Sequence, residues 1–287
     1  MLDAIQAREA FHITLLRRLV NRVPDGLRLK GGVNLRLFFG SVRYSEDMDF
    51  DADPRHSARM QEYLAHIVRD QGYKRELEKL GIDDVEPNAV QPAAGAGVKY
   101  KVNVILGGVR LPTKIEVSFR DSTPAEWAER TGAPRDIIEV YGGANVEDFE
   151  VTRYPHAVAV VQKVNALATR AGVQARDIFD LDWLLNQERF PNTKDAAKGL
   201  LRRVHTQENL DEAHRRCLDA LDEQYRDQVE SFLSVSARNQ FDGQWTDMRL
   251  RVHGILGDVL KMPAPDPGNA AVNVPVDQKP PEIRRKQ

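Results

Sequence analysis

Two runs of alternating apolar and polar residues lie on either side of Gly107-Gly108. They span Val98–Leu106 and Leu111–Phe119, and a glycine pair between such runs is typical of a β-hairpin. Ahead of them the patterns predict helices over residues 3–22, 33–39 and 55–71 and short strands at Leu27–Lys30 and Asp47–Phe50. This order of elements predicts a small mixed sheet with helices on one side.

The second half of the chain has a different pattern. Helices are expected over residues 158–169, 174–185, 193–235 and 244–260, whereas residues 81–97 are rich in Gly, Pro and Ala and predict a loop. We therefore expect an α+β domain over residues 1–122 and a mainly α-helical domain over residues 123–262. Residues 263–287 contain six prolines and predict a disordered tail.

Composition excludes several classes of protein. The single cysteine, Cys217, excludes an internal disulfide. The sequence has no run of about 18 apolar residues, so no membrane span is expected. A cytoplasmic protein is expected. The net charge of −2 means that any nucleic acid must be held by a local basic patch. Lysines and arginines do cluster at residues 17–22, 99–101 and 198–203, although each cluster alone is more often a solvated face.

The strand that contains Asp47 and Asp49 carries the strongest chemical signal. Side chains two residues apart in a strand share a face, so both carboxylates point to one side while Met48 and Phe50 point to the core. Carboxylates placed in this way can bind Mg²⁺, which prefers hard oxygen ligands and bridges them to phosphates. Without its context, such a pair is more often a solvated strand edge.

Neighbouring segments strengthen this interpretation. Gly40-Ser41 lies just upstream, where glycine lets the backbone approach a phosphate and serine can donate its hydroxyl, although Gly-Ser is also common in turns. Gly31-Gly32 predicts no more than a tight turn. In the strand Lys114–Phe119, Glu116 faces away from the core and can supply a third carboxylate, as a metal ligand or a base for an attacking hydroxyl.

Taken together, these motifs resemble a known family. Lys30-Gly31-Gly32, Gly40-Ser41 and the run from Arg43 to Phe50 resemble the opening of the AbiEii-type nucleotidyltransferases, toxins of type IV toxin–antitoxin and abortive-infection systems that include the MenT group. Lys114–Ser118, His156–Lys163 and Arg176–Leu181 resemble the later motifs of that family, in the same order. The resemblance covers about residues 27–185.

The resemblance implies a polymerase-β-like nucleotidyltransferase domain followed by helices. It implies Asp47, Asp49 and Glu116 as the catalytic and metal-binding carboxylates. Lys163 and Asp177 complete the implied catalytic residues, with Asp177 orienting Lys163 or the acceptor. The implied nucleotide-binding residues are Gly40, Ser41, Lys114, Lys163 and Arg170. Lys163 is equally typical of a lysine that lies along an interface, and Asp177 of an acid near a helix start.

The expected activity is transfer of nucleotides from an NTP to an acceptor, with Mg²⁺ or Mn²⁺ as cofactor. For the MenT relatives the resemblance implies the 3′ end of tRNA as acceptor, which blocks translation, and a cognate antitoxin as a partner. Two alternatives remain open at this stage. The acceptor could be a protein hydroxyl, or the chain could be a catalytically silent binding module of the same fold.

Overall fold

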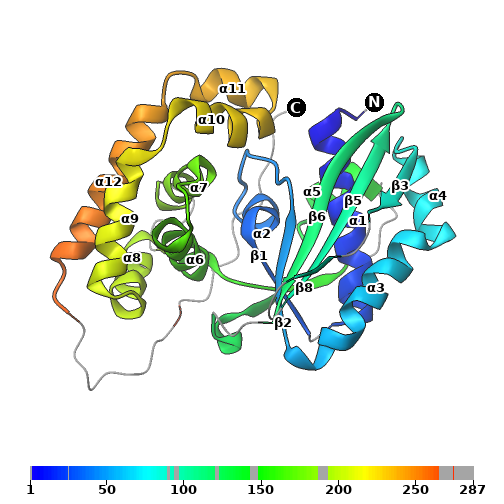
Figure 1. The fold of residues 1–287 in the computed structure, drawn as a ribbon, viewed down its shortest axis with the longest axis horizontal. Coiled ribbons are helices and arrows are strands. Elements are labelled where there is room, and N and C mark those ends of the chain that lie inside the picture. Colours follow the sequence, from blue (N-terminus) through cyan, green and yellow to red (C-terminus); the bar gives the residue numbers. More distant parts are fainter. Residues whose placement is uncertain are drawn as a thin grey trace. The chain divides into compact units, whose positions relative to one another are not determined.

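The computed structural model describes residues 2–24, 26–88, 91–93, 97–119, 123–142, 148–186, 193–264 and 274 (Figure 1). The chain divides into two compact units, Met1–Tyr154 and Pro155–Gln287. Apart from residues 263, 264 and 274, the predicted tail lies outside the described residues. Among the described helices, none combines the length and the hydropathy that crossing a membrane requires.

A mixed sheet organises the first unit. In the described part of the chain it has eight strands in the order β3-β5-β6-β2-β1-β8-β7, with β4 paired to β5. The strands are β1 (Leu27–Lys30), β2 (Met48–Ala52), β3 (Asp84–Pro87), β4 (Gln91–Ala93), β5 (Gly97–Leu106), β6 (Val109–Ser118), β7 (Glu129–Gly132) and β8 (Glu150–Arg153). The predicted hairpin is β5–β6, and β2 pairs in parallel with β6 and antiparallel with β1.

Helices cover the apolar face of this sheet. They are α1 (Ala4–Arg22), α2 (Gly31–Phe38), α3 (Ser57–Arg69), α4 (Gln71–Lys79) and α5 (Arg135–Gly142), with single 3₁₀ turns at Pro54–His56 and Ala125–Trp127. Helix α1 begins at Asp3, whose side chain accepts from the backbone N–H of Gln6 in a capping box. Phe11 and Leu15 of α1 are completely buried, as are Tyr100 and Val102 of β5, and α1 contacts both β5 and β6.

Two parts of the first unit differ from the prediction. Residues 81–97 were expected to be a loop, but β3 and β4 lie in this segment because each pairs with β5, a contact that local composition does not reveal. The domain boundary expected after residue 122 lies inside the first unit. Strand β8 pairs in parallel with β1 and antiparallel with β7, so both strands extend the sheet.

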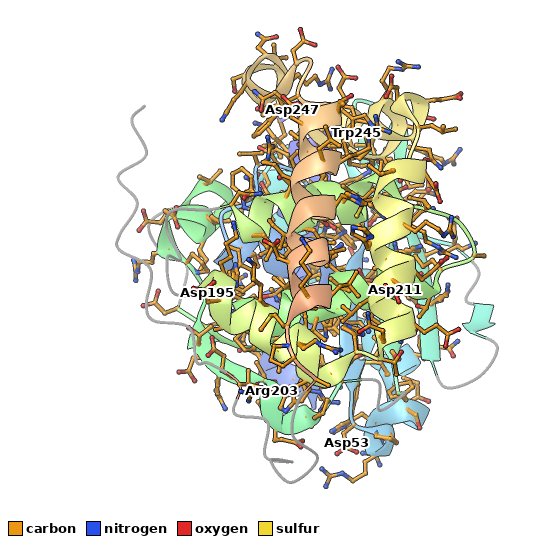
Figure 2. The ribbon with its side chains drawn as sticks, turned by 90° about the vertical axis from the view of Figure 1, so that its left-hand side faces the viewer. Asp53, Asp195, Arg203, Asp211, Trp245 and Asp247 are labelled. Atoms are coloured by element: carbon orange, nitrogen blue, oxygen red, sulfur yellow. The ribbon has the colours of Figure 1, made fainter. Side chains whose placement is uncertain are left out.

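The second unit is helical. Its helices are α6 (His156–Thr169), α7 (Ala175–Leu185), α8 (Thr193–Val204), α9 (Gln207–Asp219), α10 (Asp222–Gln228), α11 (Val235–Phe241) and α12 (Trp245–Lys261), with a 3₁₀ turn at Glu230–Phe232. Helix α6 contacts α7, α8 and α9, and α12 runs beside α9 (Figure 2). The fold class predicted from the sequence, a mixed sheet with helices followed by a mainly helical part, is confirmed.

Candidate active site

Aspartates alternate along β2 and the residue before it. Asp47 directly precedes the strand, and Asp49 and Asp51 lie within it. Because side chains two residues apart in a strand point to the same side, the three carboxylates share one face of the sheet. Met48 and Phe50, which lie between them, are completely buried on the other face. The alternation of acidic and apolar residues therefore includes Asp51 as well as the predicted pair, Asp47 and Asp49.

Charged residues form a row across four neighbouring strands on this face. Lys99 of β5 is opposite Glu116 of β6, and Glu116 is in turn opposite Asp49 of β2. Asp49 is also opposite Lys30 of β1. Neighbouring strands of a sheet, parallel or antiparallel, lie about 4.7–4.9 Å apart. Two acids flanked by two lysines thus lie side by side, although they come from distant segments of the chain.

Lys114 bridges two of the predicted metal ligands. Its Nζ lies 3.1 Å from Oδ2 of Asp47 and 2.9 Å from Oε1 of Glu116. The Nζ of Lys99 lies 3.2 Å from the same oxygen of Glu116. The side chain of Asp47 is 12% exposed and that of Glu116 29% exposed. The two carboxylates share one ammonium group, which shows that they are close enough to bind a common cation.

The surroundings shift the pKa values of the carboxyl groups of Asp47 and Glu116 in opposite directions. Burial raises the pKa of Asp47 to about 6, against the opposing effect of Lys114. Burial also acts to raise the pKa of Glu116, but the hydrogen bonds and charges of Lys114 and Lys99 outweigh it, so this pKa is lowered. The pKa of Lys114 is raised, because the two acids outweigh its own burial. Glu116 is therefore ionised at neutral pH, whereas Asp47 begins to take up a proton in mild acid.

Asp51 and Lys30 were not singled out as site residues from the sequence. Asp51 is only 1% exposed, and its Oδ1 lies 2.5 Å from Nζ of Lys30. The hydroxyl of Tyr154 donates to the other carboxylate oxygen, at 3.0 Å. Both oxygens of this buried carboxylate thus have a partner, as a buried charged group requires. The continued alternation beyond Asp49 was the signal that could have revealed Asp51.

Gly31 and Gly32 do more than permit a turn. Gly31 has a φ of +69°, and a Cβ at this position would collide with Oδ2 of Asp49. A Cβ at Gly32 would collide with Oγ of Ser45. Ser45 in turn donates to the backbone carbonyl of Asp47 at 2.7 Å. The two glycines therefore leave the room that Asp49 and the chain entering β2 occupy.

Gly31→Ala is expected to lower the free energy of unfolding more than Gly107→Ala does. Both glycines have positive φ, so alanine costs about 1–2 kcal/mol at either position. Only Gly31 has a neighbour within 4 Å of the added Cβ, and the resulting crowding should cost about 1–3 kcal/mol more. Urea unfolding of the two variants measures the difference. Equal losses would show that Asp49 does not pack against Gly31.

Gly40-Ser41 is a compact turn. Gly40 has a φ of +63°. Ser41 is 1% exposed, and its Oγ accepts from the backbone N–H of Arg43 at 3.3 Å. Its backbone N–H donates to the carbonyl of Leu35, and its carbonyl accepts from Nη1 of Arg36 at 2.8 Å. The hydroxyl, the backbone N–H and the carbonyl of Ser41 are thus all hydrogen-bonded to nearby residues of the chain. A role of Ser41 in phosphate binding remains a proposal.

A buried histidine anchors the segment that leads into β2. Nε2 of His12 lies 2.8 Å from Oγ1 of Thr113, which donates to the backbone carbonyl of Glu46 at 2.7 Å. His12 is 1% exposed. Burial, helped by the nearby charge of Arg8, lowers the pKa of His12 from 6.5 to about 3. The imidazole is therefore neutral in the folded protein at any pH above about 3.

This buried imidazole predicts a loss of stability in acid. The unfolded chain takes up a proton at His12 below its ordinary pKa of 6.5, whereas the folded chain takes it up only near 3. The stabilisation present above pH 6.5 is lost as the pH falls, by about 3 kcal/mol at pH 4. His12→Gln should flatten the plot of unfolding free energy against pH over this interval. Parallel plots for the two proteins would contradict the prediction, since carboxylates titrate equally in both.

The second unit holds the remaining predicted residues in one cluster. Nζ of Lys163 on α6 lies 2.9 Å from Oδ1 of Asp177 and 2.6 Å from Oδ2 of Asp180, both on α7. Asp177 is 1% and Asp180 0% exposed at the side chain, and Lys163 is 12% exposed. Nη1 of Arg170 lies 2.5 Å from Oδ2 of Asp177 and is the most exposed part of the cluster.

The structure thus brings the predicted residues together in two groups. Asp47, Glu116 and Lys114 contact each other in the first unit, with Asp49 opposite Glu116 in the strand register. Lys163 and Arg170 share Asp177 in the second unit. The expected link between Lys163 and Asp177 is present as an ion pair, and Asp180 joins it as a further partner that the sequence left undecided.

The donor atoms of the first unit fit a hard divalent cation. Asp47, Asp49 and Glu116 offer the carboxylate oxygens that Mg²⁺ prefers, and the ammonium of Lys114 already occupies a cation position between two of them. As the side chains stand, no three histidine, cysteine or acidic groups among the described residues converge on one point. A metal ion would therefore take the place of Lys114 rather than enter a preformed cage.

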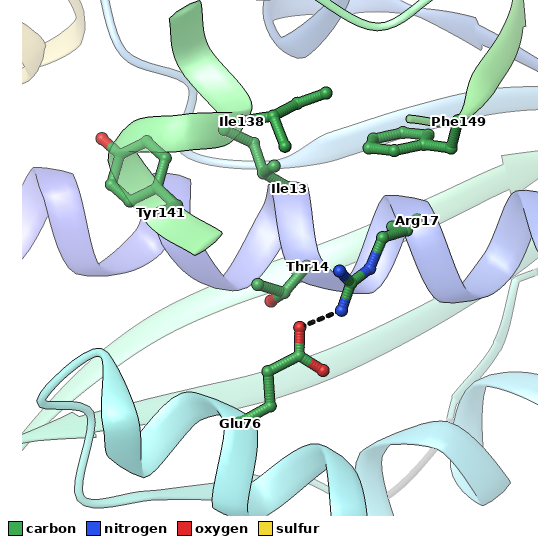
Figure 3. A pocket seen from close by; sticks show the side chains of 7 residues that line it. All are labelled: Ile13, Thr14, Arg17, Glu76, Ile138, Tyr141 and Phe149. Atoms are coloured by element: carbon green, nitrogen blue, oxygen red, sulfur yellow. Dashed lines mark hydrogen bonds and ion pairs between the residues drawn. The ribbon is translucent and has the colours of Figure 1, made fainter. Parts of the chain in front are cut away.

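Small hollows elsewhere in the first unit are not part of this site. One has a volume of about 10 Å³ and is lined by side chains that include Ile13, Arg17, Glu76 and Tyr141 (Figure 3). Arg17 and Glu76 form an ion pair across it. A space of this size holds about one water molecule. It is too small for a nucleotide and contains none of the predicted site residues.

Comparison with known proteins assigns the chain to a family. The sequence profile of the family described as "Nucleotidyl transferase AbiEii toxin, Type IV TA system" matches residues 14–258. The chain belongs to this family. The match spans both units and includes every residue of the two groups described above, so the predicted AbiEii membership is confirmed.

Two solved structures resemble this AbiEii chain. One is a protein from H. pylori that has been assigned as a nucleotidyltransferase, and the other is JHP933 from Helicobacter pylori. Each has a TM-score of 0.50 and 16% sequence identity over 90% of this chain. The similarity covers 95% of the first structure and 92% of the second. At this identity the likeness shows the fold alone. None of the curated proteins compared with the chain matches it.

Proposed function

We propose that this AbiEii-family chain is a Mg²⁺-dependent nucleotidyltransferase that transfers a nucleotide from an NTP to the 3′ end of tRNA. The observation that carries the proposal is the pairing of Asp47 and Glu116 around one cation, with Asp49 beside Glu116 in the register. Oxygen ligands at this spacing suit the metal-assisted transfer of a phosphoryl group. Mn²⁺ can take the place of Mg²⁺, since it prefers the same ligands.

In the proposed reaction an acceptor hydroxyl forms a bond to the α-phosphorus of the NTP. The bond from that phosphorus to the oxygen bridging to the β-phosphate breaks, and pyrophosphate leaves. A divalent metal ion, when bound, would supply positive charge to the attacking and leaving oxygens. Asp47, Asp49 and Glu116 would hold this ion, and Glu116, which is ionised at neutral pH, is also proposed to accept the proton of the hydroxyl.

The proposed contacts to phosphate are basic side chains. Lys114 lies next to the carboxylates of the first unit. In the second unit the side chain of Arg170 is partly exposed, which favours it as a phosphate contact, whereas Lys163 is held between two aspartates. We assign phosphate binding first to Lys114 and Arg170. Lys163 and the Gly40-Ser41 turn remain proposed contacts, and Asp177 orients the two basic side chains of its cluster.

The biological role that we propose is that of the toxin in a type IV toxin–antitoxin pair. An antitoxin partner is implied by the family. Adding nucleotides to the 3′ end of tRNA would block aminoacylation and halt translation, so the protein would act in the cytoplasm. The acceptor must be held by local contacts, because the chain has a net charge of −2.

Labelled nucleotides test this proposal. The purified chain is incubated with Mg²⁺, total tRNA and total cell protein, and with each of the four NTPs labelled at either the α- or the γ-phosphate. The expected result is α-label on tRNA and no γ-label, because pyrophosphate leaves. If the α-label appeared on protein instead, the acceptor would be a protein hydroxyl, and the proposed nucleotide transfer would still hold. If no α-label reached any acceptor, the chain would be a catalytically silent binding module of the same fold. If the product carried γ-label, the chain would be a kinase.

A further inference from the structure

The side chain of Lys114 occupies the place in which the two carboxylates would hold a metal ion. We propose that Lys114 is a built-in counter-ion that masks Asp47 and Glu116 until a nucleoside triphosphate binds and draws its ammonium away. This inference rests on the proposed function, and it adds a control of metal binding that the proposed reaction itself does not require.

Geometry makes the ammonium and a metal mutually exclusive. Nζ of Lys114 is 3.1 Å from one oxygen of Asp47 and 2.9 Å from one oxygen of Glu116. Mg²⁺ binds oxygen at about 2.0–2.1 Å, so an ion ligated by these two oxygens would occupy the space of the ammonium. Binding of the free metal therefore has to displace Lys114 first. The ion pairs that are lost in this step weaken the apparent affinity.

The surroundings hold Lys114 in place without trapping it. Lys101 lies directly opposite Lys114 in the β5–β6 register and is exposed, and like charges in this arrangement repel. The repulsion favours the position of Lys114 next to the acids. The side chain of Lys114 is 32% exposed, so it can leave without opening the core. Lys99, on the other side, contacts Glu116 and not Asp47 among the ion pairs of this site.

A triphosphate would reverse this balance. It brings several negative charges close to the carboxylates, so the ammonium of Lys114 gains a phosphate partner when it leaves Asp47 and Glu116. The metal then takes the vacated position with phosphate oxygens as further ligands. Two ligands that each favour the same displaced state bind cooperatively, by an equal factor in either order. Free Mg²⁺ would bind weakly, and Mg²⁺ together with NTP would bind tightly.

Mn²⁺ binding, followed by the loss of the free-ion signal in electron paramagnetic resonance, tests the proposal on the full-length chain. Lys114→Met removes the ammonium but keeps the length of the side chain. Lys114→Arg keeps the charge, and Lys101→Met is the matched control on the neighbouring strand. Without nucleotide, Lys114→Met should bind Mn²⁺ more tightly than the unmodified protein, by about 5- to 150-fold. The other two variants should stay within a few-fold of it.

The same variants give a readout that is independent of activity. In EDTA, Lys114→Met should melt at a lower temperature than Lys101→Met, because Asp47 and Glu116 then repel each other without the ammonium that they share. Mn²⁺ should raise the melting temperature of Lys114→Met more than that of the unmodified chain. A non-hydrolysable NTP analogue should strengthen Mn²⁺ binding to the unmodified chain, relative to the analogue alone in solution, and should do so less for Lys114→Met.

Unchanged or weaker Mn²⁺ binding by Lys114→Met would overturn the proposal, as would the absence of analogue-dependent binding in the unmodified chain. If Lys114→Met does not fold, the analogue effect and Lys114→Arg decide the question. Failure of the proposed function has a different signature. Lys114→Met would bind Mn²⁺ more tightly while no NTP label reaches tRNA or protein, and the masking of the metal site would then stand without the transferase.

Discussion

Asp49→Asn is expected to lower transfer of α-label to RNA by about 10³-fold or more, while the protein still unfolds near its original temperature. Asp49 lies at the centre of the charged row, opposite Glu116 on one side and Lys30 on the other. The amide keeps the size of the side chain but removes the charge that binds a metal. A metal ligand contributes several kcal/mol to stabilising the transition state, and each 1.36 kcal/mol is a factor of ten in rate.

Glu86→Gln is the matched control for this change. It also converts an acid to an amide on the same sheet, but Glu86 lies on β3 and pairs with Arg110 at 3.0 Å, away from the charged row. It should retain nearly full activity. Both variants need a thermal melt beside the transfer assay. Full transfer by Asp49→Asn at saturating Mg²⁺ would sink the assignment of this carboxylate to the metal.

Lys163→Met is expected to lower the free energy of unfolding of this protein by about 3–5 kcal/mol. Lys163 is the shared partner of Asp177 and Asp180, which are 1% and 0% exposed. Without its ammonium, Asp180 loses the ion pair at 2.6 Å, and Asp177 loses the one at 2.9 Å but keeps its pair with Arg170. A buried carboxylate without its counter-ion costs much more than the pair itself contributes. Denaturant unfolding followed by circular dichroism measures the loss.

Lys198→Met provides the control in the same unit. Lys198 of α8 lies 3.5 Å from Asp258, whose side chain is 60% exposed, so its loss should cost no more than about 1 kcal/mol. Adding Asp180→Asn to Lys163→Met should recover part of the lost stability, because one of the two buried negative charges that Lys163 neutralised is removed. If the double variant were no more stable than the single one, the cost would lie in packing and not in charge.

The burial of Lys163 changes how its phosphate role must be tested. A fall in NTP use by Lys163→Met cannot by itself separate phosphate binding from the stability of the α6–α7 contact. Arg170→Met separates them better, because this guanidinium is 41% exposed and its removal leaves Lys163 beside both aspartates. Weaker NTP binding by a variant that retains its melting temperature would support a direct contact with the triphosphate.

Local patterns were sufficient to predict several elements. The hairpin at Gly107-Gly108 was predicted because a tight turn and the alternation beside it depend only on neighbouring residues. The helix over residues 3–22 followed in the same way from its spacing of apolar residues, and its observed range is Ala4–Arg22. The shared face of Asp47 and Asp49 depends only on the period of two in a strand. These features need no knowledge of distant segments.

Other features escaped local patterns because they depend on pairing over long distances. β3 and β4 form because they pair with β5, and β8 joins the sheet through β1, more than a hundred residues earlier in the chain. The buried state of Ser41 follows from the turn that closes around it. From the sequence, the Ser41 hydroxyl is either a candidate donor to a phosphate or part of an ordinary turn, and no pattern within the turn distinguishes the two roles.

By itself, the sequence determined the classes of element, the family and the identity of the acidic side chains, since periodicity and motif order are properties of the chain alone. Only the tertiary structure decided which charges meet. The register of β2 against β6 brings Glu116 beside Asp49 and sets Lys114 between Asp47 and Glu116. It equally decided that Lys163 lies between two buried aspartates. Ion pairs depend on distances of a few ångströms between segments that folding alone brings together.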